Sequence, residues 1–92
     1  MKIVINDKIQ KYLQRRYKGD KKGVMAIQAF LELLEQNQNP TALKNAKKMQ
    51  GNYQKYGNIW RWRIGNYRII GDVKNEILEI QLIEISTRQD AY

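Results

Sequence analysis

Two residue types that proteins commonly use for catalysis are absent from this sequence of 92 residues. Without cysteine, the chain has no disulfide and no thiolate metal site. Without histidine, it lacks the commonest metal ligand and the usual acid–base group at neutral pH. Any catalysis must therefore use hydroxyl, carboxyl, lysine, arginine or tyrosine groups, and we expect no metal and no other cofactor.

Proline and long apolar runs are also scarce. The chain has one proline and 42% hydrophobic residues, which is typical of a globular protein. No apolar run approaches the roughly 20 residues of a membrane-spanning helix, and the apolar start of the chain is too short for a signal peptide. We therefore expect a cytoplasmic protein without a membrane partner, with one domain over residues 1–92.

Acidic residues are missing from the middle of the chain. The sequence has 17 Lys and Arg against 9 Asp and Glu, and residues 36–71 hold seven basic residues and no acid. Such a basic block indicates a polyanionic partner: a nucleic acid, an acidic membrane surface or an acidic protein. Outside the arginines, the candidate contacts to this partner are Lys44, Lys47, Lys48, Lys55 and Tyr56.

Hydrophobic spacing predicts an α+β fold. Residues 2–5 form a strand, a helix follows from Asn6 or Asp7, and a second helix runs over about residues 22–36 after the break KGDKKG. For residues 41–56 the sequence is compatible with two structures: a short helical turn capped by Thr41, or a loop. Three strands follow over residues 59–64, 67–73 and 77–85. The order β-α-α-β-β-β predicts a helical hairpin packed on an antiparallel sheet.

The turn Gly65-Asn66 fixes how the first two of these three strands pair. A two-residue hairpin loop places Ile64 opposite Tyr67, and Arg63 opposite Arg68. One face then forms the core, with Trp60, Trp62, Ile64, Tyr67, Ile69, Val73, Leu78, Ile80 and Leu82. The opposite face gathers Arg61, Arg63 and Arg68.

Three arginines on one face of a small sheet repel one another, because like charges directly opposite destabilise a sheet. A phosphate would relieve this repulsion, since the planar guanidinium group can bond two of its oxygens. Two other interpretations stay open. The arginines are simply solvated, or they pair with Asp72 and Glu79, which share that face in the predicted register.

A family resemblance is carried by the same segment. Residues 60–68, WRWRIGNYR, resemble the W-R-x-R-x-G-x-Y-R segment of the RelE/ParE superfamily of bacterial toxins. Residues 87–92, TRQDAY, are similar to the H-R-x-x-x-Y ending of that family, and Met49-Gln50-Gly51 is similar to its L-x-G before the second strand. The resemblance implies a single RelE-like toxin domain over residues 1–92.

The resemblance also implies a function. RelE-type members are toxins of type II toxin–antitoxin systems that cut mRNA in the ribosomal A site, by attack of a ribose 2′-OH on the adjacent phosphate. Matched position by position, the implied catalytic residues are Arg61, Arg63, Arg68, Arg88 and Tyr92. The five candidate contacts named above would then bind RNA. The implied partners are mRNA on the ribosome and a cognate acidic antitoxin.

The chain departs from the family pattern where protons are transferred. Thr87 stands at the position of the family's histidine, and Gly71 at that of a common tyrosine. Arginines also replace the lysines of some members, and an arginine is a poor general base because it holds its proton. We therefore expect a slow enzyme, or one that relies on the ribosome. The alternatives are a ParE-like inhibitor of DNA gyrase and a non-catalytic RNA- or ribosome-binding module.

Overall fold

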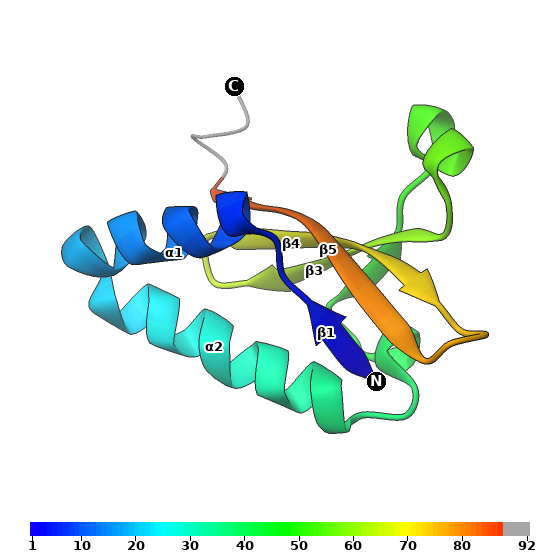
Figure 1. Ribbon diagram of the computed structural model, residues 1–92, viewed down its shortest axis with the longest axis horizontal. Helices are drawn as coiled ribbons and strands as arrows, with labels where there is room; N and C mark the ends of the chain where they lie inside the picture. The colour runs from blue at the N-terminus through cyan, green and yellow to red at the C-terminus, as the bar shows by residue number, and fades with distance from the viewer. Residues whose placement is uncertain (88–92) are drawn as a thin grey trace.

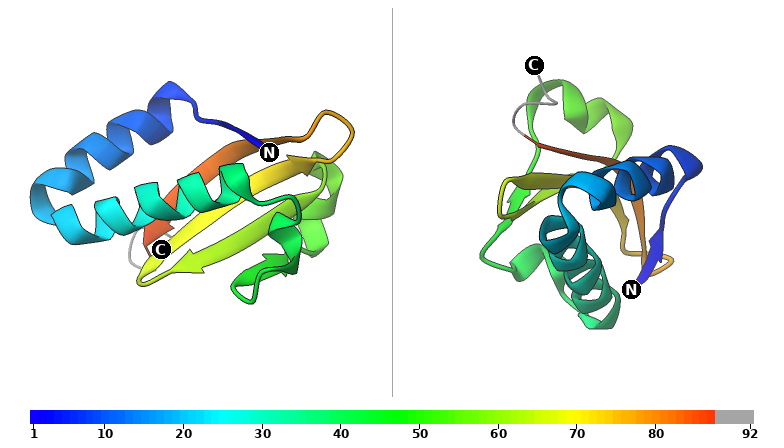
Figure 2. Two further views of the ribbon diagram at one scale, coloured as in Figure 1. Left: turned by 90° about the horizontal axis from the view of Figure 1, so that it is seen from below. Right: turned by 90° about the vertical axis from the view of Figure 1, so that its left-hand side faces the viewer.

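The computed structural model describes residues 1–87, which form two helices on one side of a sheet (Figures 1 and 2). Within these residues the sheet has five strands in the order β1-β5-β4-β3-β2. The elements are β1 (Lys2–Val4), α1 (Asp7–Gly19), α2 (Lys21–Gln36), the 3₁₀ helix η1 (Pro40–Ala42), β2 (Ala46–Lys48), the 3₁₀ helix η2 (Gly51–Tyr56), β3 (Ile59–Ile64), β4 (Tyr67–Lys74) and β5 (Glu79–Thr87).

The predicted helical hairpin is confirmed, and both helices start at a side-chain cap. Asn6 Oδ1 accepts a hydrogen bond from the backbone N–H of Ile9 at 2.8 Å, and Asp20 Oδ1 accepts one from that of Gly23 at 3.0 Å. Each cap satisfies a backbone donor that the helix itself leaves free. Because Asp20 ends α1 and caps α2, the two helices reverse direction within a single residue.

The α+β fold class is confirmed, with one addition to the predicted strands. From β2 to β5 the sheet is antiparallel, and β1 joins its edge parallel to β5. The addition is β2, a three-residue strand paired with β3. It lies in residues 41–56, for which the sequence predicted either a helical turn or a loop. The helical turn η1 begins at Pro40, so Thr41 lies inside it and does not cap it.

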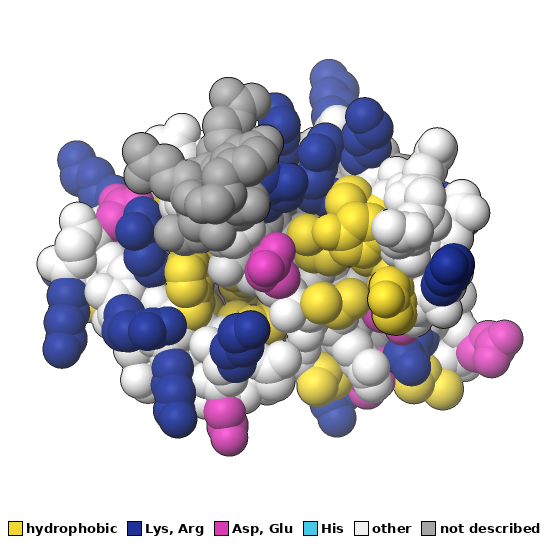
Figure 3. Space-filling view, turned by 90° about the horizontal axis from the view of Figure 1, so that it is seen from above, with side chains coloured by type: hydrophobic (Ala, Val, Ile, Leu, Met, Phe, Trp, Pro, Cys, Tyr) yellow, Lys and Arg dark blue, Asp and Glu magenta, His cyan; other side chains and the backbone are white. Residues whose placement is uncertain are grey.

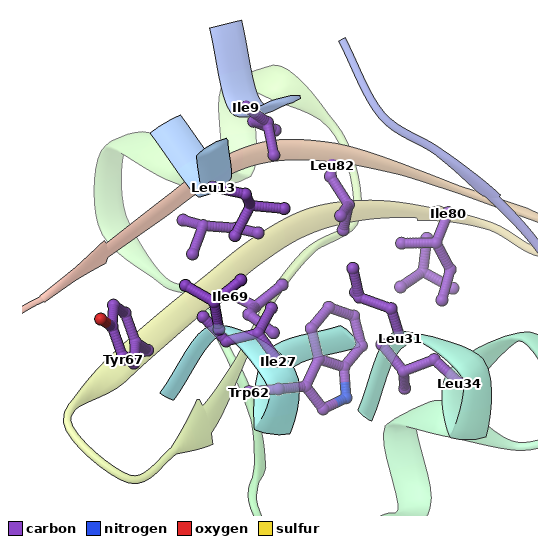
Figure 4. Close-up of a cluster of buried hydrophobic side chains, with 13 residues drawn as sticks. Ile9, Leu13, Ile27, Leu31, Leu34, Trp62, Tyr67, Ile69, Ile80 and Leu82 are labelled. Atoms are coloured by element: carbon purple, nitrogen blue, oxygen red, sulfur yellow. The ribbon is translucent and has the colours of Figure 1, made fainter. Parts of the chain in front are cut away.

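The core lies between the helices and one face of the sheet (Figure 4). Six of the nine predicted core residues of the sheet are buried there: Trp62, Tyr67, Ile69, Val73, Ile80 and Leu82. Trp60 and Ile64 are half-buried and pack against them. Leu78 is the wrong prediction, with 63% of its surface exposed, because it occupies the turn before β5 with a positive φ of 52°.

A β-bulge interrupts the pairing of β4 with β5. Gly71 lies opposite Leu82, whereas the preceding Ile70 lies opposite Glu84, so Ile83 is the extra residue. An extra residue reverses which side chains of a strand face the core. Ile85 is therefore buried, and Glu84 lies on the opposite face of the sheet.

The long helices α1 and α2 pack on the sheet through buried apolar side chains: Ile9 and Leu13 from α1, and Val24, Ile27, Leu31 and Leu34 from α2. Neither α1 nor α2, nor any other helix within residues 1–87, is long and apolar enough to cross a membrane.

Candidate nucleic-acid interface

Four basic side chains from three adjacent strands share the sheet face turned away from the core. The β3–β4 register is the predicted one, so Arg63 lies opposite Arg68, and Arg61 lies opposite Ile70. On the other side of β3, Lys47 lies opposite Arg61. We call Lys47, Arg61, Arg63 and Arg68 the basic face. Figure 3, viewed from the side opposite to the left panel of Figure 2, shows Lys and Arg side chains gathered beside hydrophobic ones.

Arg61 is the most constrained member of the basic face. Its side chain is half-buried, and its Nε is fully buried without a hydrogen-bond partner in the described part of the chain. Burial lowers the pKa of Arg61, and the neighbouring charges of Arg63 and Arg68 lower it further. An unsatisfied buried donor costs roughly 1–3 kcal/mol. A hydrogen-bond acceptor for this Nε would remove that cost.

The predicted alternative of pairing with Asp72 or Glu79 does not occur. Asp72 Oδ1 accepts from the backbone N–H of Asn58 at 3.1 Å, and its Oδ2 lies 3.9 Å from Lys74 Nζ. Glu79 Oε2 accepts from Gln81 Nε2 at 3.1 Å. Both carboxylates lie toward the far end of the strands. Among residues 1–87, no carboxylate forms a salt bridge with an arginine of the basic face.

The β3–β4 turn places two of the arginines around a small cavity. Gly65 adopts a positive φ of 58°, which the tight turn requires and which glycine tolerates best. The cavity has a volume of about 230 Å³ and is lined by Arg63, Gly65, Asn66, Tyr67 and Arg68. Two of its five lining residues, Arg63 and Arg68, belong to the basic face.

Tyr67 anchors this hairpin to the turn between the two helices. Its hydroxyl donates to Asp20 Oδ2 at 2.7 Å and accepts from Arg16 Nε at 3.2 Å. The hydrogen bond from Tyr67 is the largest cause of a lowered pKa of Asp20, followed by that from Gly23. Burial raises the pKa of Tyr67, and the bond to Asp20 adds to that effect. The arginines at the turn are thus held by a helix-to-hairpin contact.

The other predicted site residues are spread more widely. Lys48 lies opposite Trp60 and so on the core side of β2, where it is exposed. Lys44 is exposed between η1 and β2. Lys55 and Tyr56 are exposed in η2, and Tyr56 retains 74% of its surface. Arg88 and Tyr92 lie outside the described residues, so the structure does not bear on them.

One charged residue on this side of the sheet was missed by the sequence analysis. Glu84 lies opposite Ile70 and accepts a hydrogen bond from Ser86 Oγ at 3.5 Å, while Ser86 lies opposite Arg68. Simple alternation along β5 assigns Glu84 to the core, and only the bulge turns it outward. Thr87, at the position of the family's histidine, lies opposite Tyr67 on the core side and is buried.

Residues 1–87 contain no grouping of three or more Asp and Glu side chains, with His and Cys absent, that could hold a metal ion.

Comparison with known proteins gives a single kind of likeness. No protein-family model matches the sequence, and no curated protein matches it. A chain of the archaeal RelE–RelB complex from Pyrococcus horikoshii OT3 is similar in structure, with a TM-score of 0.71 and 23% sequence identity. The likeness covers 95% of this chain and 93% of that one. The chain therefore has the RelE-like fold that its sequence motifs predict.

Proposed function

We propose that this protein is the toxin of a type II toxin–antitoxin system and cleaves mRNA on the ribosome. The observation that carries the proposal is the convergence of Arg61, Arg63 and Arg68 on one sheet face of a RelE-like fold, with no carboxylate paired to them among residues 1–87. The buried, unpaired Nε of Arg61 supports an anionic ligand in particular.

In the proposed reaction, a ribose 2′-oxygen attacks the adjacent phosphorus. The O2′–P bond forms and the P–O5′ bond breaks, which leaves a 2′,3′-cyclic phosphate and a 5′-OH. The phosphorane transition state gains negative charge, and guanidinium groups that are already in place stabilise it without reorganisation. Such a contact is worth several kcal/mol of barrier, of the order of 3 kcal/mol for one donor. Arg88 and Tyr92 complete the proposed catalytic set.

The proposed RNA contacts divide into two groups by position. Lys47 extends the basic face across β2 and would bind a phosphate next to the one held by the arginines. Lys44, Lys48, Lys55 and the exposed ring of Tyr56 lie outside the basic face, in or next to β2 and η2, and would follow the RNA backbone or stack on a base.

An acidic antitoxin is the second proposed partner. The basic face would attract a chain of opposite charge, and the structural neighbour comes from a RelE–RelB complex. An antitoxin segment that covers Arg61 and Arg63 would block the same surface that binds RNA.

Cleavage on purified ribosomes with a defined message in the A site tests the proposal. We expect the wild-type protein to cut the message, and Arg68→Ala to slow cutting by roughly 100-fold or more. Lys22→Ala is the matched control, because it removes one exposed positive charge at the start of α2, outside the basic face, and should leave cutting unchanged. Ribosome binding without cutting would instead support a binding module, and inhibition of DNA gyrase would support the ParE-like alternative.

A further inference from the structure

We propose that Glu84 is the general base of this reaction, a role that no recognised motif of the sequence assigns to it. The inference rests on the proposed function. It is carried by the β-bulge in β5, where Ile83 is the extra residue opposite Ile70 and Gly71. Because of this bulge, Glu84 lies on the side of the sheet that bears the arginines.

The sheet register brings Glu84 within reach of the arginines. Glu84 lies opposite Ile70, and Ile70 lies opposite Arg61, so the three residues form one row across β5, β4 and β3. Arg68 is two residues before Ile70 and is therefore a diagonal neighbour of Glu84. Such neighbours lie about 7–8 Å apart at their Cα atoms, which long side chains can span.

Glu84 is also available to act. It is exposed, and its described hydrogen bond is the long one from Ser86 Oγ at 3.5 Å. The other two carboxylates of this side, Asp72 and Glu79, are held by Asn58, Lys74 and Gln81. Among these three carboxylates, Glu84 is the one nearest to Arg68 in the register.

The chemistry requires such a group. The chain has no histidine, and arginines keep their protons at neutral pH. A carboxylate is ionised at neutral pH and accepts a proton readily when it is placed next to the reacting hydroxyl. The Glu84 carboxylate takes the proton of the 2′-OH as the O2′–P bond forms. When the P–O5′ bond breaks, the 5′-oxygen takes a proton from water, and Glu84 returns its own proton to solvent.

Basic side chains from α1 and from the neighbouring strands lie near Glu84, together with apolar and hydroxyl groups. Arg61 and Arg68 face it from β3 and β4. From α1, Lys8, Tyr12 and Arg15 line a cavity of about 190 Å³ together with Glu84 and Ser86.

The test compares Glu84→Gln with Glu79→Gln in single-turnover cleavage on ribosomes, with RNA binding measured in parallel. We expect Glu84→Gln to cut 100- to 10,000-fold more slowly. Its RNA affinity should be equal or higher, because a negative charge has been removed beside the arginines. Its rate should also fall less at acidic pH than the rate of the wild type, because the proposed base is absent. Glu79→Gln should match the wild type, and Glu84→Asp should recover part of the activity.

Two results would overturn the inference. If the wild type cuts and Glu84→Gln cuts equally fast, Glu84 is not the base, although the proposed function stands. If Glu84→Gln loses cutting and affinity together, or keeps the acidic decline of the wild type, its effect is structural. A wild type that never cuts overturns the proposed function, and the role of Glu84 with it. Circular dichroism and thermal unfolding of each variant establish that it is folded.

Discussion

At the scale of single residues, the hydroxyl of Tyr67 connects three parts of the molecule. It donates to Asp20 at the turn between α1 and α2, and it accepts from Arg16 on α1, while its ring lies in the core (Figure 4). Gly23 is confined by the same contact, because a Cβ there would collide with the Asp20 carboxylate and lie 2.8 Å from the Tyr67 ring. The contact therefore limits which residues this turn accepts.

Tyr67→Phe removes both hydrogen bonds and keeps the ring. We expect the free energy of unfolding at pH 7 to fall by about 1 kcal/mol, measured by urea denaturation. Tyr56→Phe, at an exposed hydroxyl in η2, is the control and should change nothing. An unchanged midpoint for Tyr67→Phe would show that water replaces the lost bonds fully.

The same substitution changes how stability depends on pH. Because the folded state lowers the pKa of Asp20 below 3.8, Asp20 stabilises the fold above that pH, and this contribution is lost as the pH falls through the folded value. Tyr67 supplies the largest part of the lowering. In Tyr67→Phe, the loss of stability between pH 5 and pH 2 should therefore be smaller than in the wild type, as measured by urea denaturation at each pH.

At the scale of elements, the packing of β4 against β5 depends on the absence of a side chain at Gly71. A Cβ there would lie 2.9 Å from Ile80 Cγ2 and 3.2 Å from Leu82 Cδ2. Both atoms belong to core side chains that cannot move far. The tyrosine that is common at this position in the resembled family would not fit this packing.

Gly71→Ala and Gly19→Ala should therefore have opposite effects. The first overpacks the core and should lower the free energy of unfolding by roughly 1–2 kcal/mol. The second is in the last turn of α1 with nothing within 4 Å of the added atom, and should raise it by about 0.5 kcal/mol. Urea denaturation of both variants checks the pair. Equal effects would mean that β5 shifts to accept the new methyl group.

At the scale of the whole molecule, charge is distributed unequally between the two faces of the sheet. The formal net charge is +8, and the four residues of the basic face lie together on three adjacent strands, on the side away from the core. The helices carry further lysines, but these are dispersed along α1 and around its turn into α2. A long polyanion would therefore bind mainly across the basic face.

The salt dependence of RNA binding measures this concentration of charge. For a single-stranded RNA, each neutralised phosphate contributes about 0.7 to the slope of log Kd against log salt concentration. We expect Arg63→Ala to reduce the slope by about that amount, and Lys22→Ala to leave it unchanged. If both variants reduce the slope equally, RNA binds to the general positive charge of the protein and not to the basic face.

Much of this fold and part of its site follow from the sequence. Apolar spacing predicted both helices, and the Gly65-Asn66 turn with strict alternation predicted the pairing of Arg63 with Arg68. These features depend on residues close together in the chain, whose side-chain periods of 3.6 and 2 are properties of the backbone. The contributions of Arg88 and Tyr92 stay a prediction, because they lie outside the described residues.

What the sequence alone determined is thus local: two helices, a hairpin, and the face on which its arginines lie. The tertiary structure decided the rest. β2 becomes a strand because the edge of β3 offers it backbone partners. Arg61 loses solvent because its neighbours cover it. Glu84 faces the arginines because one extra residue in β5 reverses the alternation. Each of these depends on contacts between distant segments, and no local pattern encodes them.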